Sequence, residues 1–96
     1  MPSGPKYIER IHLTQDGYRH EHIQEVEYRY GPTGDLDHAT TGIMALLIDE
    51  HSWDVRVKHA QGAVKVDTVH PYGRPPYLRA VADGTPTDNL LDLPKY

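Results

Sequence analysis

With 96 residues and a formal net charge of −4, the chain is long enough for one domain and lacks the excess of Lys and Arg that phosphate-binding surfaces need. The absence of cysteine excludes disulfides and thiolate zinc sites, and it agrees with a reducing cytoplasm. No apolar run is long enough to cross a membrane and the chain carries no signal-peptide pattern, so we expect a cytoplasmic domain over residues 6–96 after a loose lead-in over residues 1–5.

The first strand is predicted over residues 6–13. Ile11 and Leu13 share one face of this strand, with Tyr7 on the same parity, and polar side chains alternate with them. Residues 15–18, with the sequence Gln-Asp-Gly-Tyr, carry a turn signal.

A second strand is predicted over residues 22–30. From Val26 onwards, Val and Tyr alternate with Glu and Arg, and Ile23 falls out of phase with this alternation. The change of phase indicates a bulge near residues 24–25. A helix also fits the spacing of the apolar residues, but the density of Val and Tyr favours the strand.

A loop and then a helix follow. Residues 31–35 are rich in Gly and Pro and form the loop. Either Thr40 or Thr41 can cap the start of the helix with its hydroxyl, and residues 49–52 end it. The apolar face of this helix is predicted to consist of Ile43, Met44, Leu46, Leu47 and Ile48.

Three more strands are predicted after the helix. Residues 53–58 and 64–68 alternate between apolar and charged side chains, and Gln61-Gly62 supplies the turn of a hairpin. Residues 70–76 contain three prolines and form a rigid loop that cannot pair as a central strand. Residues 77–82 form the last predicted strand.

These elements predict an α+β fold in a single small domain. The order is strand, strand, helix, strand, strand, strand, and short links between consecutive strands favour antiparallel pairing. We therefore expect a mostly antiparallel five-stranded sheet with one helix across a face, in a β-grasp-like or related arrangement.

His20 and His22 form a His-X-His pattern that could bind a metal ion. In a strand, residues two positions apart point to the same face, and His12 on the neighbouring strand could supply a third imidazole. A solvated polar strand edge is the favoured alternative, because two histidines without a third defined ligand have low specificity. Both interpretations stay open from the sequence.

No arrangement of residues points to an enzyme. The acidic candidates are Asp35, Asp37, Asp83, Asp88 and Asp92. They lack the spacing of a calcium loop, and Asp83 fits a turn while Asp88 fits a helix cap. No nucleophile motif and no phosphate-binding glycine loop is found, so no catalytic residue and no cofactor is predicted.

A small basic and aromatic surface is predicted on the outer face of the hairpin and the last strand. Its candidate residues are Arg56, Lys58, Lys65, Arg74, Tyr77 and Arg79. Such a surface could bind an acidic protein, a nucleotide or single-stranded nucleic acid. The alternative is a solvated sheet face with cross-strand ion pairs, such as Arg56 with Asp67.

The carboxyl-terminal segment has the pattern of a structural clasp. Asp83-Gly84 reverses the chain after the last strand, and Asp88 or Asn89 can cap a short helical turn. Three leucines are then predicted to cover the open core: Leu90, Leu91 and Leu93. Because burial of each leucine contributes ~1.5–3 kcal/mol, removal of residues 88–96 is expected to unfold the protein.

The same segment carries a family resemblance. Its motifs are Tyr77-Leu78-Arg79, Ala82-Asp83-Gly84, Asp88-Asn89-Leu90-Leu91 and Leu93-Pro94, and they resemble the closing motif of a small bacterial family, domain of unknown function 3892. The chain departs from that family where Glu50-His51-Ser52 replaces a frequent glycine. The resemblance implies a bacterial or phage origin and a free-standing cytoplasmic protein, and it supplies no catalytic residue.

Three functions follow as hypotheses. The first is a non-enzymatic module that binds a protein partner through the charged sheet face or an exposed sheet edge, with self-association into a homodimer as its simplest form. The second is nucleotide or nucleic-acid binding through the basic surface, which the net negative charge disfavours. The third is the histidine metal site.

Overall fold

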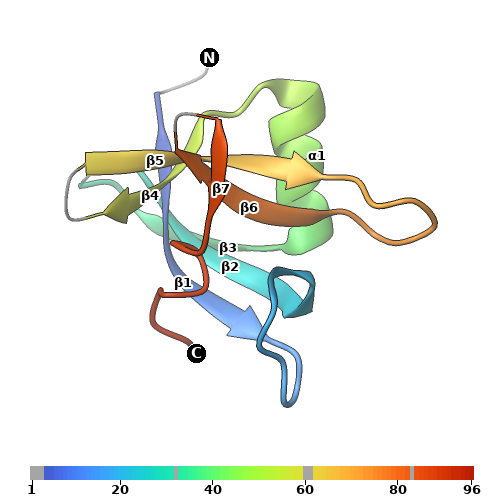
Figure 1. Cartoon of the computed structure of the whole chain (residues 1–96). Helices are drawn as coiled ribbons and strands as arrows, with labels where there is room; N and C mark the ends of the chain where they lie inside the picture. The colour runs from blue at the N-terminus through green and yellow to red at the C-terminus, as the bar shows by residue number, and fades with distance from the viewer. Residues whose placement is uncertain (1–3, 32, 60–61, 83) are drawn as a thin grey trace.

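The computed structural model describes residues 4–31, 33–59, 62–82 and 84–96, which form an α+β fold with one helix and a seven-stranded mixed sheet (Figure 1). The strands are β1 (Lys6–Leu13), β2 (Ile23–Tyr30), β3 (Leu36–Thr40), β4 (Val55–His59), β5 (Gly62–Val69), β6 (Tyr77–Ala82) and β7 (Thr85–Thr87). The helix α1 spans Thr41–His51, and a short 3-10 helix, η1, spans His20–His22.

The strand order in the sheet is β3-β2-β1-β4-β5-β6-β7. Neighbouring strands are antiparallel except β1 and β4, which run parallel and pair only over Lys6–Ile8. The parallel pair arises because α1 carries the chain from β3 to the far side of β1. Figure 1 shows β5 and β6 crossing in front of β1 and β2, so the sheet is strongly twisted, and α1 packs against β2 and β3 as well as β5 and β6.

The prediction of five strands is wrong in number. β1 and β6 have the predicted bounds, β2, β4 and β5 begin and end within two residues of theirs, and the β4–β5 hairpin is confirmed. Two observed strands, β3 and β7, were not predicted. In β3 only Ala39 is buried, so the strand lacks an apolar alternation, and β7 contains Pro86, which argues against a strand.

Two bulges interrupt the pairing of β1 with β2. One skips Gln24 in β2 and confirms the predicted bulge. The other skips Glu9 in β1, and a bulge reverses the alternation of side chains. Ile8 is therefore buried together with Ile11, and Tyr7 lies on the opposite face, so the prediction that Tyr7 faces the core with Ile11 is wrong.

Helix α1 begins at a threonine cap, as predicted. The Thr40 hydroxyl accepts a hydrogen bond from the Ile43 N–H at 3.2 Å. The buried side chains of the helix are Thr41, Met44 and Ala45. Their spacing defines a narrow core-facing stripe, and Ile43 and Leu46 point away from it with exposed fractions of 55% and 47%. The predicted apolar face is therefore wrong for these two residues.

One hydrophobic cluster forms the core between the sheet and the helix. Its buried members are Ile8, Ile11, Ile23, Val26, Tyr28, Ala39, Met44, Ala45, Val55, Val57, Val66, Leu78, Ala80 and Leu90. The cluster draws on α1 and on six of the strands, and Leu90 extends it to the carboxyl-terminal segment.

The carboxyl-terminal segment covers the core as the clasp interpretation predicted. Leu90 is fully buried, and Leu91 and Leu93 pack against the cluster. The predicted cap differs, because the hydroxyl of Thr87 accepts the hydrogen bond from the Asn89 N–H at 3.4 Å.

Some predictions fall outside the described residues: the lead-in at residues 1–3, Pro32 in the loop, Gln61 in the hairpin turn and Asp83 in the Asp-Gly turn. The turn glycine Gly84 has φ +78°, a backbone conformation that favours glycine. Among the residues that are described, no helix is long and apolar enough to cross a lipid bilayer.

Candidate functional site

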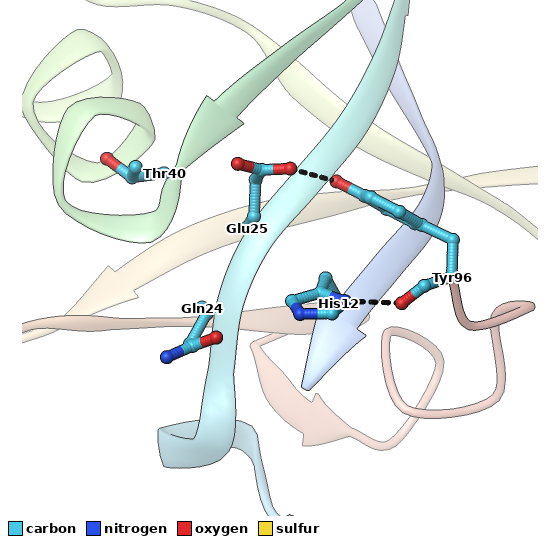
Figure 2. A pocket seen from close by; sticks show the side chains of 5 residues that line it. All are labelled: His12, Gln24, Glu25, Thr40 and Tyr96. Atoms are coloured by element: carbon cyan, nitrogen blue, oxygen red, sulfur yellow. Dashed lines mark hydrogen bonds between the residues drawn. The ribbon is translucent and has the colours of Figure 1, made fainter. Parts of the chain in front are cut away.

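A cavity of about 530 Å³, here called the Tyr96 pocket, opens beside β1, β2 and β3 (Figure 2). Its lining residues are His12, Gln24, Glu25, Thr40 and Tyr96. Strand pairing brings three of them together, because His12 lies directly opposite Glu25 and Glu25 lies opposite Thr40. Gln24 is the bulge residue of β2 and is exposed to solvent.

Tyr96 reaches this pocket because residues 94–96, here called the tail segment, pair with β1. The Ile11 N–H donates to the Pro94 carbonyl at 3.0 Å, and the Tyr96 N–H donates to the Ile11 carbonyl at 3.1 Å. The two bonds form an isolated parallel bridge between Ile11 and Lys95. Since β4 pairs only with the first half of β1, the tail segment occupies the edge that the second half leaves open.

Tyr96 makes polar contacts through both its side chain and its main chain. Its hydroxyl donates a hydrogen bond to Glu25 Oε1 at 2.8 Å, and its main-chain oxygen contacts His12 Nδ1, as the dashed lines in Figure 2 mark. Burial and the Glu25 carboxylate raise the pKa of the Tyr96 hydroxyl. The hydroxyl therefore stays protonated at neutral pH and acts as a donor.

A charge network lies beside Tyr96 on β1, β2 and β3. Arg10 binds the Glu27 carboxylate through two bonds of 2.7 and 2.6 Å, and His38 Nε2 lies 3.0 Å from Glu27 Oε2. The Glu27 side chain is only 7% exposed. Hydrogen bonding to Arg10 is the main cause that lowers the pKa of the Glu27 carboxyl, so this group is ionised at neutral pH.

The same network surrounds the Tyr96 ring. The Arg10 guanidinium lies 5.0 Å from the ring centroid, within the range of a cation–π contact. The imidazoles of His12 and His38 each lie 5.5 Å from it, centroid to centroid. Glu27 binds Arg10 through two hydrogen bonds, and this pair fixes the position of the guanidinium beside the tyrosine ring.

The pocket offers hydrogen-bond donors, hydrogen-bond acceptors and an aromatic ring, which are the groups that recognise a ligand. Its carboxylate at Glu25 accepts a hydrogen bond from the protonated hydroxyl of Tyr96. The geometry therefore suits binding.

The structure does not bring the three candidate metal ligands together. His20 and His22 lie in η1 instead of a strand, so the argument that they share a strand face does not apply. His20 is buried, His22 Nδ1 accepts hydrogen bonds from the N–H groups of Tyr18 and Arg19 at 3.0 and 3.1 Å, and His12 lies in the Tyr96 pocket. Within the described ranges, no group of three or more His, Cys, Asp or Glu side chains could hold a metal ion.

The predicted basic residues divide between two places. Arg56 lies directly opposite Lys65, and both line a cavity of about 400 Å³ together with Trp53. Arg74 instead lines a cavity of about 220 Å³ beside the start of α1. Lys58 lies with its ammonium 5.5 Å from the centre of a tyrosine ring on β1.

Acidic side chains accompany three of these cations. The pairs are Arg56 with Asp54 at 2.8 Å, Lys65 with Asp67 at 3.9 Å and Arg79 with Asp88 at 3.5 Å. Arg56 therefore bonds to Asp54 rather than to Asp67, the cross-strand partner suggested by the sequence. Tyr77 is half-buried on β6, and the pairing of β5 with β6 that would bring it near the hairpin is observed.

A protein-family model described as a protein of unknown function (DUF3892) matches residues 4–94, which is nearly the whole chain. The chain belongs to the DUF3892 family. No curated protein and no solved structure matches this DUF3892 protein, so the β-grasp comparison stays a prediction. The matched region includes the strands around the pocket and ends at Pro94, two residues before Tyr96.

Of the residues that line the Tyr96 pocket, only His12 was predicted as a candidate site residue. The alternation along the first two strands placed Arg10 and Glu27 on polar faces, and cross-strand pairing of opposite charges was a usable signal for their contact. Tyr96 gave no comparable signal, because its position depends on the return of the chain to β1.

Proposed function

We propose that this protein is a non-enzymatic interaction module that binds a second copy of itself through the edge strand β3. The observation that carries the proposal is the position of β3, which is the last strand in the sheet order and pairs only with β2 among the described strands. An edge strand presents unpaired N–H and C=O groups to a further strand. The absence of cysteine supports a cytoplasmic setting for this association.

The two edges of the sheet differ in their protection. β7 is three residues long and contains Pro86, and short strands and prolines are common means of blocking an edge. β3 is five residues long and contains neither proline nor lysine. Its Leu36 side chain is 45% exposed. The open edge is therefore β3.

The direction of the backbone groups defines which residues of β3 would pair. The Asp35 carbonyl accepts a bond from the Tyr30 N–H of β2, whereas the His38 N–H bonds to the side chain of Asp37 at 2.8 Å. Along a strand, the N–H and C=O groups of successive residues point alternately to the two neighbouring strands. The N–H and C=O groups of Leu36 and His38 therefore point away from β2. An incoming strand would displace the Asp37 carboxylate from the His38 N–H.

Self-pairing also accounts for the exposed leucine. An antiparallel pair of β3 strands centred on His38 places Leu36 of each copy opposite Thr40 of the other. Thr40 lines the Tyr96 pocket, so the pocket of one copy would lie beside the exposed leucine of the other. In strand addition, main-chain bonds supply affinity and adjacent pockets for side chains supply specificity.

The test compares two leucines of nearly equal exposure. Leu36→Lys changes the edge strand, and Leu46→Lys changes α1, where the side chain is 47% exposed. We expect the wild type and Leu46→Lys to approach twice the 10.9 kDa mass of one chain in sedimentation equilibrium as concentration rises, and Leu36→Lys to remain a monomer. A wild type that stays a monomer, or a dimer lost only in Leu46→Lys, would contradict the proposal.

A second candidate function is nucleotide binding at the cavity of Trp53, Arg56 and Lys65. The observation that favours it is that two cations and an indole line one cavity, since cations and aromatic rings together recognise phosphates and bases. A bound phosphate would have to displace Asp54 and Asp67, which line the same cavity and pair with these cations. Nucleotide affinity should fall steeply with salt and should be lost in Arg56→Glu. Affinity that Arg56→Glu leaves intact would remove this candidate.

A further inference from the structure

The second half of β1 has an open edge that the protein fills with its own chain. β4 pairs with β1 only as far as Ile8, and the main chain of Ile11 then bonds to the tail segment through one N–H and one carbonyl. This edge, with the side chains of Arg10, His12, Glu25 and His38 around the tyrosine, is here called the β1 slot. The contacts of the tail segment in this slot indicate which features of a peptide the slot recognises.

Recognition in the β1 slot uses few features of the tail segment. The slot takes the carbonyl of Pro94 and the N–H of Tyr96, and neither bond needs an N–H at position 94, where proline has none. The tyrosine hydroxyl then bonds to Glu25, and its ring meets the Arg10 guanidinium. A peptide of the form Pro-X-Tyr in an extended conformation meets all these requirements.

The tail segment does not belong to the hydrophobic core. Leu90 is fully buried in the core, and the turn that follows it is closed by its own bonds from Asp92 to Asp88 and from Leu93 to Leu90, each 3.2 Å long. Pro94 and Lys95 are exposed, and Tyr96 is half-buried. The clasp therefore ends at Leu93, and residues 94–96 add their contacts with the β1 slot. We therefore expect the tail segment to leave the slot while the rest of the chain stays folded.

We propose that the β1 slot is a binding site for an extended Pro-X-Tyr segment of a partner protein, and that the tail segment is an internal competitor that occupies it in the free protein. The partner adds a short parallel strand beside Ile11 and inserts its tyrosine between the two imidazoles. The apparent affinity for the partner is the intrinsic affinity of the slot multiplied by the fraction of time for which the tail segment leaves it free. This inference does not depend on association through β3.

The experiment uses the full chain and a synthetic peptide, Leu-Asp-Leu-Pro-Lys-Tyr, which copies residues 91–96. Tyr96→Ala weakens the internal competitor, so this variant should bind the peptide more tightly than the wild type does. Replacing the peptide tyrosine by phenylalanine removes one hydrogen bond to a carboxylate and should weaken binding about ten-fold. In Tyr96→Ala combined with Glu25→Ala, the two peptides should bind equally.

Amide hydrogen exchange in the isotope-labelled wild type distinguishes replacement of the tail segment by the peptide from detachment of the tail segment alone. With unlabelled peptide in excess, the Tyr96 amide should lose its protection while the Ile11 amide keeps it, because the peptide carbonyl replaces that of Pro94. Loss of protection at both amides would mean that the tail segment detaches without being replaced, and no change at either would mean that nothing binds. Both results overturn the proposal, as does equal binding of the scrambled peptide Lys-Leu-Tyr-Asp-Pro-Leu.

Peptide binding in the β1 slot and self-association through β3 can be tested independently of each other. Leu36→Lys removes the exposed leucine of β3 and leaves every side chain of the β1 slot unchanged. We expect it to bind the peptide as the wild type does, even if no dimer is ever observed. Loss of peptide binding in Leu36→Lys would place the peptide on β3 and overturn the assignment of the β1 slot.

Discussion

The hydroxyl of Tyr96 donates a hydrogen bond of 2.8 Å to the carboxylate of Glu25, 71 positions away in the chain. This bond joins the tail segment to β2 across β1, so three segments of chain meet at one side chain. Hydrogen bonds to charged acceptors contribute more to stability than neutral ones do.

A double-mutant cycle on Tyr96 and Glu25 should reveal this bond. Tyr96→Phe removes the donor, and we expect the free energy of unfolding to fall by about 1.5–3 kcal/mol in urea denaturation, the range for a bond to a charged group. Glu25→Gln weakens the acceptor, so the double variant should lose less than the sum of the two single losses. Strictly additive losses would show that the two side chains do not interact in solution.

Leu90 should be the most sensitive position of the clasp. Its side chain is fully buried in the core, so Leu90→Ala is expected to cost about 2–5 kcal/mol in the free energy of unfolding. Leu46→Ala serves as the control, because a side chain that is 47% exposed should lose far less. Equal costs at the two positions in chemical denaturation would contradict the packing of residue 90.

Two glycines should respond in opposite directions to alanine. A Cβ at Gly34 would lie 1.9 Å from the Tyr30 carbonyl oxygen, so Gly34→Ala should lower the melting temperature and disturb the connection from β2 to β3. A Cβ at Gly42 in α1 would meet nothing within 4 Å, and Gly42→Ala should stabilise the protein by about 0.5–1 kcal/mol through helix propensity. Calorimetry on the pair tests both signs at once.

His20 should make the protein sensitive to mild acid. Its side chain is buried, and burial is the main cause that lowers its pKa, with a further contribution from the Arg79 charge, opposed by Asp88 and Glu21. The unfolded chain takes up the proton near the ordinary pKa of 6.5, while the folded protein takes it up only at lower pH. Stability should therefore fall as pH decreases below about 6.5, until the folded protein is protonated as well.

The measurement is the free energy of unfolding between pH 7.5 and about 5, a range chosen to stay above the titration of ordinary carboxyls. His20→Gln should flatten the slope in this range. His70→Gln is the matched control, because the His70 side chain is 62% exposed. A slope unchanged by His20→Gln would assign the acid sensitivity to another group.

Much of the fold could be predicted from local pattern. The cap at Thr40 and the bulge at Gln24 both follow from a few neighbouring residues, and both are observed. β3 could not be predicted in this way, since its only buried residue is Ala39 and it gains its hydrogen bonds from β2 rather than from its own pattern. The bulge at Glu9 gave no signal, and it alone reversed the predicted face of Tyr7.

The candidate site was less predictable for a topological reason. His20 and His22 were placed on a strand by spacing alone, and the chain instead forms a single helical turn there. Tyr96 has no other aromatic residue near it in the sequence, and its role depends on the path that residues 88–93 take from β7 back to β1. No short-range pattern encodes that path.

The short pairing between β1 and β4 has a consequence for how the chain folds during synthesis. β1, β2 and β3 can pair with one another from nearby sequence, yet the second half of β1 waits for residues 94–96, and His12 meets Tyr96 across 84 positions. Throughout that interval the nascent chain exposes a strand edge around Ile11, the kind of edge from which misassembly starts. Pairing of the tail segment therefore covers this one edge of β1 and removes it as a point of contact with neighbouring chains.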